Sequence, residues 1–279
     1  LERRFYKKTF DFAITHIAPT WVFEHLRKYS SKCIKMDRKP VDSTLFEDKS
    51  TALSKKKEKF TFFCPQRMGI PKGTDILWKA LGYCKTDFQI LQVDWRDTGT
   101  DEENKTSLQL RENLPSQVEL IPMIKRKNMP SYYYWADAVI GNLRIGSFEY
   151  VELEGVICNK PVVSFTDKSF KIILEGTELQ SPFLPEHNDP KIIAEIIDNI
   201  VSSADFREKL YKKEYEFVKE IADPNKAGEW WDSLFEKMIK ENPSINRKSS
   251  GITVKLRMLS FLISNRLYFR KIKNYSRSA

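Results

Sequence analysis

The feature that most constrains the fold is a regular alternation of short apolar runs with helix-patterned segments, which begins at Phe60. Strands are expected at 60–64, 88–93, 118–121, 138–140 and 162–165, and helices at about 74–83, 106–114, 129–135, from 151, at 190–202 and at 205–222. This alternation is typical of an α/β protein, because helices form the crossovers between parallel strands. We therefore predict a Rossmann-like, doubly wound, mostly parallel sheet, with ligands beyond the carboxyl ends of its strands.

Two cations follow the first of these strands. The loop Gln66–Gly73 carries Arg67 and Lys72 and leads directly into the helix at about 74–83. Cationic side chains and the amides at a helix N-terminus both favour anions, so this loop is a plausible place to hold a phosphate. The alternative is an ordinary solvated loop.

The stretch Glu154–Val163 combines a short helix, a tight turn at Asn159–Pro161 and a buried strand, as in a wound α/β sheet. Glu154 supplies a carboxylate that can accept hydrogen bonds from a sugar hydroxyl. It can equally be a carboxylate at a helix N-terminus, stabilised by the helix dipole. With the cations of the Gln66–Gly73 loop, the first interpretation gives a site for a diphosphate and a sugar.

The composition limits other kinds of site. Three histidines and four cysteines are spread over 279 residues without a Cys-x-x-Cys pair, which argues against a metal site and favours buried, reduced thiols. We see no apolar run of membrane-spanning length and no signal peptide. The net charge of +9 suits phosphorylated substrates, nucleic acid or an anionic membrane surface.

Charged and aromatic residues are unevenly distributed. Lys55–Lys57 is expected to be a solvated run, whereas the region after Arg247 has many Lys and Arg and no Asp or Glu. Residues 252–273 show a helical apolar stripe surrounded by cations, typical of an interfacial amphipathic helix, although a docking helix has the same pattern. Tyr132–Trp135 favours core packing over a base-stacking platform. The aromatic residues of Trp230–Met238 have the helical spacing of a packing face.

The first sixty residues have a less regular pattern. The chain begins at Leu1 as if within a domain, so we expect a fragment or a trimmed protein. The expected elements are a strand at 10–15, a helix opened by Pro19, a strand at 33–36, an ordered connection at 40–46 and a polar linker at 47–58. Further along, the acidic stretch 97–105 is expected to be a loop.

Four segments, in the right order over about residues 40–165, resemble the C-terminal half of a GT-B-type retaining glycosyltransferase, of the family called glycosyl transferases group 1. Pro40–Phe46 resembles the family's Gly-Val-Asp-x-x-x-Phe inter-domain segment. Arg67 and Lys72-Gly73 resemble its Gly-Arg-x-x-x-x-Lys-Gly loop, with Gln66 where glycine is usual. Trp135–Ile140 resembles its Ala-Asp-Val strand entry, and Ser147–Glu154 resembles the second part of its Glu-x7-Glu motif.

The resemblance implies two Rossmann-like domains, with a nucleotide-sugar donor held mainly by the C-terminal one. Arg67 and Lys72 would then grip the nucleotide diphosphate. The backbone amides around Tyr150 and Val151, at a helix N-terminus, would help to bind phosphate.

The rest of the donor is implied to lie further along the same edge. Glu154 would accept hydrogen bonds from the ribose hydroxyls, and Met123, in the segment Pro122–Ile124, falls where the family cradles the base. No metal ion or cofactor is implied, because fixed cations and the helix end neutralise the leaving diphosphate. The sequence assigns no catalytic residue.

Two departures from the family pattern put activity in question. Gly146 stands where the first glutamate of Glu-x7-Glu, which normally holds the donor sugar, is expected. Asp94–Asp97 replaces the usual glycine-rich loop after the second strand. Most of the N-terminal acceptor domain is also absent, so we expect little transfer by this chain alone.

The sequence therefore predicts a glycosyltransferase, or its donor-binding half, of the retaining, metal-independent hexosyltransferase type, using a UDP- or GDP-sugar. The predicted regions are a remnant of the acceptor domain with the inter-domain segment (1–46), a linker (47–58), the donor-binding domain (59–222), a crossing helix (223–246) and a basic tail (247–279). A cytoplasmic enzyme, brought by its tail to a membrane and a lipid-linked acceptor, is one version of this hypothesis. The alternatives are a non-catalytic nucleotide- or polyphosphate-binding module and a basic domain for membrane or nucleic acid. Nucleic acid is not the expected partner, and the oligomeric state is not predicted.

Overall fold

A parallel five-stranded sheet forms the centre of the protein. A computed structural model describes residues 13–15, 24–25, 33–36, 38–46, 53–54, 56–95 and 100–241. The strands are β3 (Thr61–Cys64), β4 (Gln89–Val93), β5 (Val118–Ile121), β6 (Ala138–Ile140) and β7 (Val162–Val163), in the order β5-β4-β3-β6-β7. All four pairings are parallel, which confirms the predicted Rossmann-like sheet. From β3 the chain adds β4 and β5 on one side of the sheet and then β6 and β7 on the other, so the strand order reverses between β3 and β6. A ligand crevice is expected at this point.

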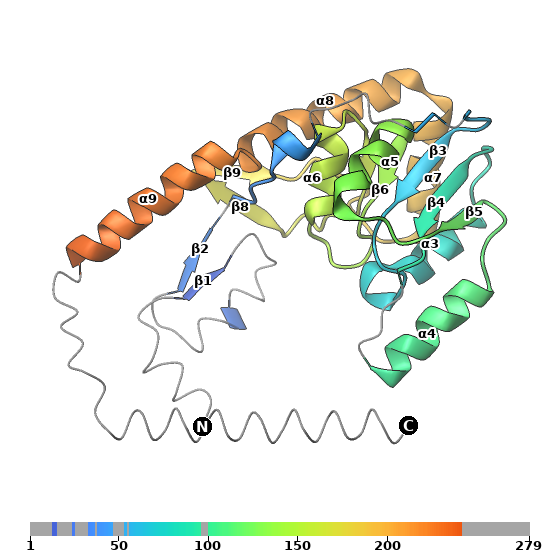
Figure 1. The fold of residues 1–279 in the computed structure, drawn as a ribbon, viewed down its shortest axis with the longest axis horizontal. Helices are drawn as coiled ribbons and strands as arrows, with labels where there is room; N and C mark the ends of the chain where they lie inside the picture. Colours follow the sequence, from blue (N-terminus) through green and yellow to red (C-terminus); the bar gives the residue numbers. More distant parts are fainter. Residues whose placement is uncertain are drawn as a thin grey trace. The chain divides into compact units, whose positions relative to one another are not determined.

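Helices cover both faces of this sheet (Figure 1). From β3 onward the helices are α3 (Thr74–Leu81), α4 (Asp101–Glu112), α5 (Met129–Trp135), α6 (Tyr150–Ile157), α7 (Pro190–Ser202), α8 (Ala204–Ile221) and, largely within a second unit, α9 (Pro224–Glu241). Short 3₁₀ turns are η1 (Ser43–Phe46), η3 (Ile70–Lys72) and η4 (Arg126–Asn128). Successive side chains of a strand point to opposite sides of the sheet, so neighbouring residues pack against helices on opposite faces. Phe62 packs with α3 and α7, and Phe63 packs with α5, α6 and α8.

Most elements of the central sheet were predicted within one or two residues. The strands at 118–121 and 138–140 and the helices at 129–135 and 190–202 agree with the structure at both ends. Tyr133 and Trp135 are buried, so the interpretation of 132–135 as core packing is confirmed.

The expected loop at 97–105 is wrong from residue 101 onward. Helix α4 begins at Asp101, because Thr100 caps it: the Glu103 amide donates to Thr100 Oγ1 at 3.1 Å, and the Thr100 amide donates to Glu103 Oε2 at 2.7 Å. This reciprocal capping box, and acidic residues in the first turn, stabilise a helix N-terminus. The acidic composition therefore marked a helix start.

A β-hairpin between β7 and α7 was not predicted. Strands β8 (Lys171–Leu174) and β9 (Thr177–Gln180) pair antiparallel around a turn in which Glu175 and Gly176 have φ of 51° and 83°. Arg38 donates to Glu175 and to the carbonyl of Glu220, so the hairpin and the end of α8 are both tied to the segment that precedes η1.

The N-terminal elements are described only in part. Strands β1 (Ala13–Thr15) and β2 (Cys33–Lys35) pair in parallel. Only residues 24–25 of the predicted helix after Pro19 are described. Most of the linker 47–58 lies outside the described residues. The tail 247–279 lies outside them as well.

Residues 1–228 and 229–279 form separate compact units. The described part of the second unit belongs to α9, where the ring of Trp231 lies 5.1 Å from that of Trp230 and 5.4 Å from that of Phe235. Across the ranges that the structure describes, no helix is both long enough and apolar enough to cross a membrane.

Candidate functional site

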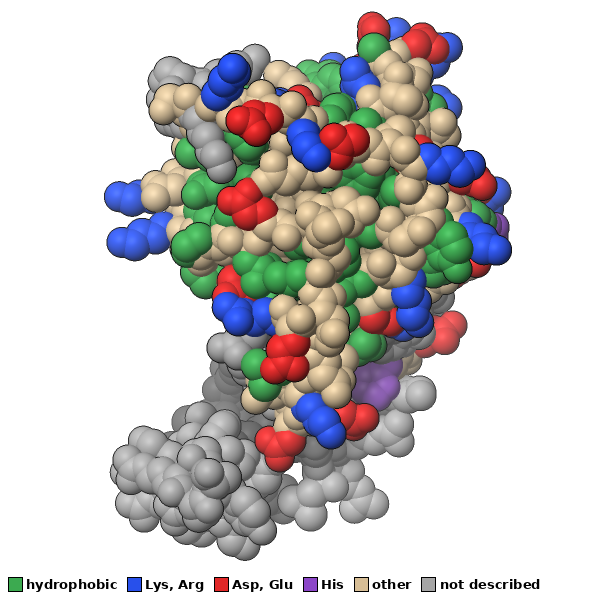
Figure 2. Space-filling view, turned by 90° about the vertical axis from the view of Figure 1, so that its right-hand side faces the viewer, with side chains coloured by type: hydrophobic (Ala, Val, Ile, Leu, Met, Phe, Trp, Pro, Cys, Tyr) green, Lys and Arg blue, Asp and Glu red, His purple; other side chains and the backbone are tan. Residues whose placement is uncertain are grey.

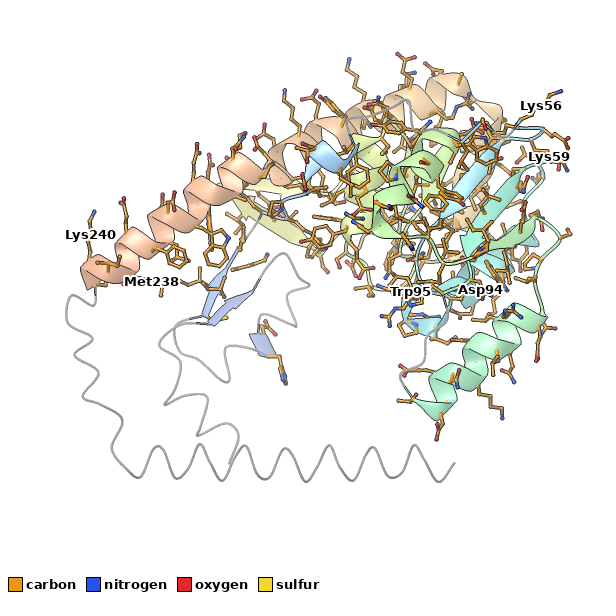
Figure 3. The ribbon with its side chains drawn as sticks, in the orientation of Figure 1. Lys56, Lys59, Asp94, Trp95, Met238 and Lys240 are labelled. Carbon is orange, nitrogen blue, oxygen red and sulfur yellow. The ribbon has the colours of Figure 1, made fainter. Side chains whose placement is uncertain are left out.

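The loops that follow β3 and β6 meet at the carboxyl edge of the sheet, where the strand order reverses. Figure 3 places Asp94 and Trp95 at this end of β4, and Lys56 and Lys59 at the opposite end of the sheet. Lys57 pairs there with Asp137, at 2.6 Å. Lys56, Lys57 and Lys59 are therefore remote from the predicted site.

The loop after β3 brings Lys72 to the N-terminus of α6. Lys72 ends η3, and Gly73 then turns the chain into α3 with a φ of 77°, a conformation that other residues rarely adopt. A Cβ at Gly73 would also lie 2.9 Å from the carbonyl carbon of Leu143, so the two loops approach closely here. The ammonium of Lys72, which is largely buried, forms an ion pair with Glu149.

Glu149 and Glu152 cap α6. Glu152 is fully buried, and its carboxylate accepts from the amide of Glu149 at 2.7 Å, the amide of Asn142 at 2.7 Å and the hydroxyl of Ser164 at 2.8 Å. A Cβ built on Gly141 would overlap this carboxylate. Glu152 thus joins the loop after β6 to the start of α6, and glycine at 141 leaves room for it.

A second ammonium group lies at the same helix end. Lys39 is buried, and its Nζ donates to the carbonyl of Phe148 at 3.2 Å and lies 4.8 Å from the ring centroid of Tyr150. Burial lowers the pKa of Lys39, against the opposing effect of Glu152 and Glu149. We call Lys39, Lys72, Asn142, Glu149 and Glu152 the Lys72 cluster.

The balance of effects on Glu149 goes the other way. Burial raises the pKa of its carboxyl group, but the hydrogen bond and charge of Lys72, with Asn142 and Lys39, outweigh burial, so the pKa lies below its ordinary value. The Glu149 carboxylate is therefore ionised at neutral pH and is held by its cationic neighbours.

A second cluster surrounds Glu154, one turn further along α6. The Tyr133 hydroxyl donates to Glu154 Oε2 at 3.0 Å, and the Arg126 guanidinium approaches Oε1 at 2.6 Å. Burial raises the pKa of Glu154, although Arg126 and Tyr133 act against this. Because Glu154 is the fifth residue of α6, the alternative of a carboxylate at the helix N-terminus is wrong. We call Arg126, Tyr133 and Glu154 the Glu154 cluster.

An open groove of about 460 Å³ adjoins η4, which carries Arg126. Its lining comes from the segment after β5 and from α5: Pro122, Met123, Ile124, Lys125, Lys127, Asn128 and Tyr132. Met123 is exposed, so its side chain is available to a flat apolar group. The groove has the size of a small-ligand site.

The remaining predicted residues have mixed placements. The guanidinium of Arg67 lies 5.6 Å from the ring centroid of Trp95, whereas Lys72 contacts Glu149. Tyr150 begins α6 with an exposed ring, and Val151 packs partly against the core. The structure therefore brings Lys72, from η3, to the start of α6, the helix that also carries Glu154. The guanidinium of Arg67 lies apart from them, against the ring of Trp95 after β4.

Gly146 is required by the backbone. Its φ is 77°, and a Cβ there would lie 2.9 Å from the Cβ of Asp167 and 3.2 Å from the ring of Phe165. A glutamate at 146 would need a different path for this loop. The conformation of the segment before α6 therefore excludes the glutamate that the family usually has at this position.

The partners of the predicted residues could not be identified from the sequence. Arg126 and Tyr133 reach Glu154 from a different loop and helix, and Lys39 comes from the N-terminal region, just before Pro40. A signal did exist for Glu149 and Glu152, since two acids three residues apart before an apolar run fit a capping box.

A comparison with protein families identifies the family of this chain. The model of the family described as Glycosyl transferases group 1 matches residues 46–217, and the chain belongs to this family. No curated protein matches the sequence.

Solved structures show the same fold at low sequence identity. The Anabaena protein HepE, in complex with UDP and glucose, has a TM-score of 0.63 at 16% identity, over 84% of this chain and 65% of its own. Sucrose-phosphate synthase from Thermosynechococcus elongatus has a TM-score of 0.63 at 18% identity, over 86% of this chain and 61% of its own. A glycosyltransferase from Rickettsia africae has a TM-score of 0.62 at 18% identity, over 85% of this chain and 67% of its own. The chain thus spans roughly two thirds of the length of these proteins.

Proposed function

We propose that this chain is the donor-binding part of a glycosyltransferase that moves a sugar from a UDP- or GDP-sugar to an acceptor. The observation that carries the proposal is the position of two groups along helix α6. The ammonium of Lys72 lies at the N-terminus of this helix, and the buried carboxylate of Glu154 lies one turn further along, near an open groove. Family membership supports it. The fold neighbour HepE was solved with UDP and glucose.

Each part of the site has a role in this proposal. Lys72 and the first amides of α6, at Tyr150 and Val151, bind the diphosphate and stabilise it as it leaves. Glu154 accepts hydrogen bonds from the ribose hydroxyls, and the groove at Met123 receives the base. The proposed chemistry is transfer of a hexosyl group with retention, without a metal ion or cofactor, since cationic side chains neutralise the leaving group.

Binding can be tested by calorimetry with UDP, GDP and their sugar conjugates. Lys72→Ala and Arg67→Ala should each weaken diphosphate binding by roughly 1.5–3 kcal/mol, the value of a charge-assisted hydrogen bond. Lys56→Ala is the matched control, because Lys56 is exposed at the opposite end of the sheet. Tight binding that survives the double variant at 67 and 72 would contradict the assignment.

The acceptor and the site of action are proposed from the tail. Residues 247–279 contain nine Lys or Arg and no Asp or Glu, so the whole formal excess of +9 lies in this segment. We propose that it brings a cytoplasmic enzyme to an anionic membrane carrying a lipid-linked acceptor. Equal recovery of full-length and tail-deleted protein on anionic vesicles would refute this role.

Two alternatives make different predictions. A non-catalytic nucleotide-binding module, favoured by Gly146, would bind nucleoside diphosphates and transfer no sugar even as part of a full-length protein. A basic interaction domain would bind nucleic acid or lipid without a nucleotide. On the face in Figure 2, Lys and Arg side chains are interspersed with Asp and Glu among the described residues, an arrangement that favours neither polyanion.

A further inference from the structure

The carboxylate of Glu149 lies among the groups that would bind a phosphate. It forms the ion pair with Lys72, it accepts from Asn142 Nδ2 at 3.4 Å, and it belongs to the N-cap residue of α6. A cation, an amide donor and a helix N-terminus are the features that attract an anion. The chain therefore supplies its own anion at this position.

The two members of this pair differ in their exposure to solvent. The side chain of Lys72 is 13% exposed and that of Glu149 is 33% exposed. Lys72 sits on η3, which Gly73 ties closely to the loop at Leu143. The carboxylate can thus rotate outward to water more readily than the ammonium can leave its position.

The charge around the pair makes an exchange of anions feasible. Lys39 is buried beside the same helix end, where its charge helps to lower the pKa of Glu149 and its own pKa is lowered by the charge of Lys72. When Glu149 leaves Lys72, two lysine side chains lie at this helix end without that carboxylate between them and water. A diphosphate carries more charge than one carboxylate, so it can replace Glu149 with a net gain.

We propose that Glu149 is a built-in competitor for the phosphates of the ligand, and that a nucleoside diphosphate binds by displacing its carboxylate from Lys72. This inference rests on the proposed function. It assigns to Glu149 a role in specificity, because a ligand without a diphosphate gains nothing from displacing it. Affinity should therefore rise steeply from nucleoside to monophosphate to diphosphate.

The test compares UDP and uridine binding by calorimetry for the wild type and for Glu149→Gln. Removing the competing charge should tighten UDP binding about tenfold, the size of one charge-assisted contact, and leave uridine binding unchanged. Adding Lys72→Ala should cancel the gain, because the competition takes place at Lys72. Glu149→Ser, which keeps an N-cap oxygen, should give the same gain if the Gln variant folds poorly.

Glu112→Gln is the control for a generic loss of negative charge, since Glu112 is exposed at the end of α4. UDP binding that depends on Lys72 in the wild type, but is unchanged or weaker in both Glu149 variants, would overturn the competitor role and leave the proposed function standing. Absence of UDP and GDP binding in every variant would overturn both.

Discussion

The Lys72 cluster and the Glu154 cluster meet the same helix, α6, through their glutamates, and their ion pairs are built in opposite senses. In the Lys72 cluster the cation is the more buried member, with side-chain exposures of 13% for Lys72 and 33% for Glu149. In the Glu154 cluster the acid is the buried member, with 3% for Glu154 and 56% for Arg126. Each cluster therefore holds one fixed group and one group that can turn toward solvent.

The difference indicates what each cluster can accept. Turning Glu149 away uncovers a cation, which binds phosphate, whereas turning Arg126 away uncovers a carboxylate, which accepts hydrogen bonds from hydroxyls. A nucleoside diphosphate has phosphate and ribose groups next to each other. Under the proposed function, the two opposed pairs would bind the two halves of one such ligand.

The largest effect is expected at the buried Glu152, which joins the loop after β6 to the start of α6. Gly141→Ala should reduce the free energy of unfolding by about 2–4 kcal/mol, because the added methyl group overlaps the Glu152 carboxylate and breaks its contacts with Asn142 and Ser164. Urea unfolding measures this. Gly228→Ala is the control, since a Cβ at Gly228, in helix α9, meets nothing within 4 Å. Equal stability of the Gly141 variant and the control would contradict the role of Glu152 in joining the loop after β6 to α6.

The next effect separates the two clusters by ligand. Glu154→Ala should weaken uridine and UDP binding alike, by about tenfold to a hundredfold, because ribose is common to both ligands. Lys72→Ala should weaken UDP binding alone. Calorimetry with both ligands distinguishes the two patterns. A Glu154 variant that loses UDP but keeps uridine would place ribose elsewhere.

The pH dependence of stability should have opposite signs at the two glutamates. Because the pKa of Glu149 is lowered in the folded protein, its stabilising contribution to the free energy of unfolding is complete above the ordinary carboxyl pKa and is lost as the pH falls through the folded-state pKa. Because the pKa of Glu154 is raised, its stabilising contribution is complete below the ordinary carboxyl pKa and is lost as the pH rises through the folded-state pKa.

Urea unfolding of Glu149→Gln and Glu154→Gln against the wild type, from acid to neutral pH, measures both signs. The Glu149 variant should lose most stability relative to the wild type at neutral pH. The Glu154 variant should lose most in acid, with the loss shrinking as the pH rises. Two parallel curves would mean that the two pairs are not opposed.

The sequence predicted the sheet well and the partners of the site poorly. Strands such as 118–121 follow from local periodicity, and Lys72 and Glu154 follow motifs of fixed spacing. The Arg126–Glu154 pair depends on how η4 approaches α6, which local pattern does not contain. The hairpin at 171–180 is mostly exposed and mixes charged with apolar residues, so its alternation was weak.

The smallest effect is expected from salt. Raising the NaCl concentration from about 0.05 to about 0.5 M should weaken UDP binding only about threefold, because Lys72 is largely buried and is screened less than an exposed cation. Uridine binding should not change, since the Glu154 cluster meets an uncharged sugar. In the wild type, salt weakens the attraction of Lys72 for the competing Glu149 carboxylate as well as for the ligand, and the two effects partly cancel. In Glu149→Gln only the attraction for the ligand is weakened, so the salt effect on UDP binding should be larger. Calorimetry at several salt concentrations gives all three slopes, and a uridine affinity that falls as steeply as that of UDP would show that the two clusters do not divide the ligand in this way.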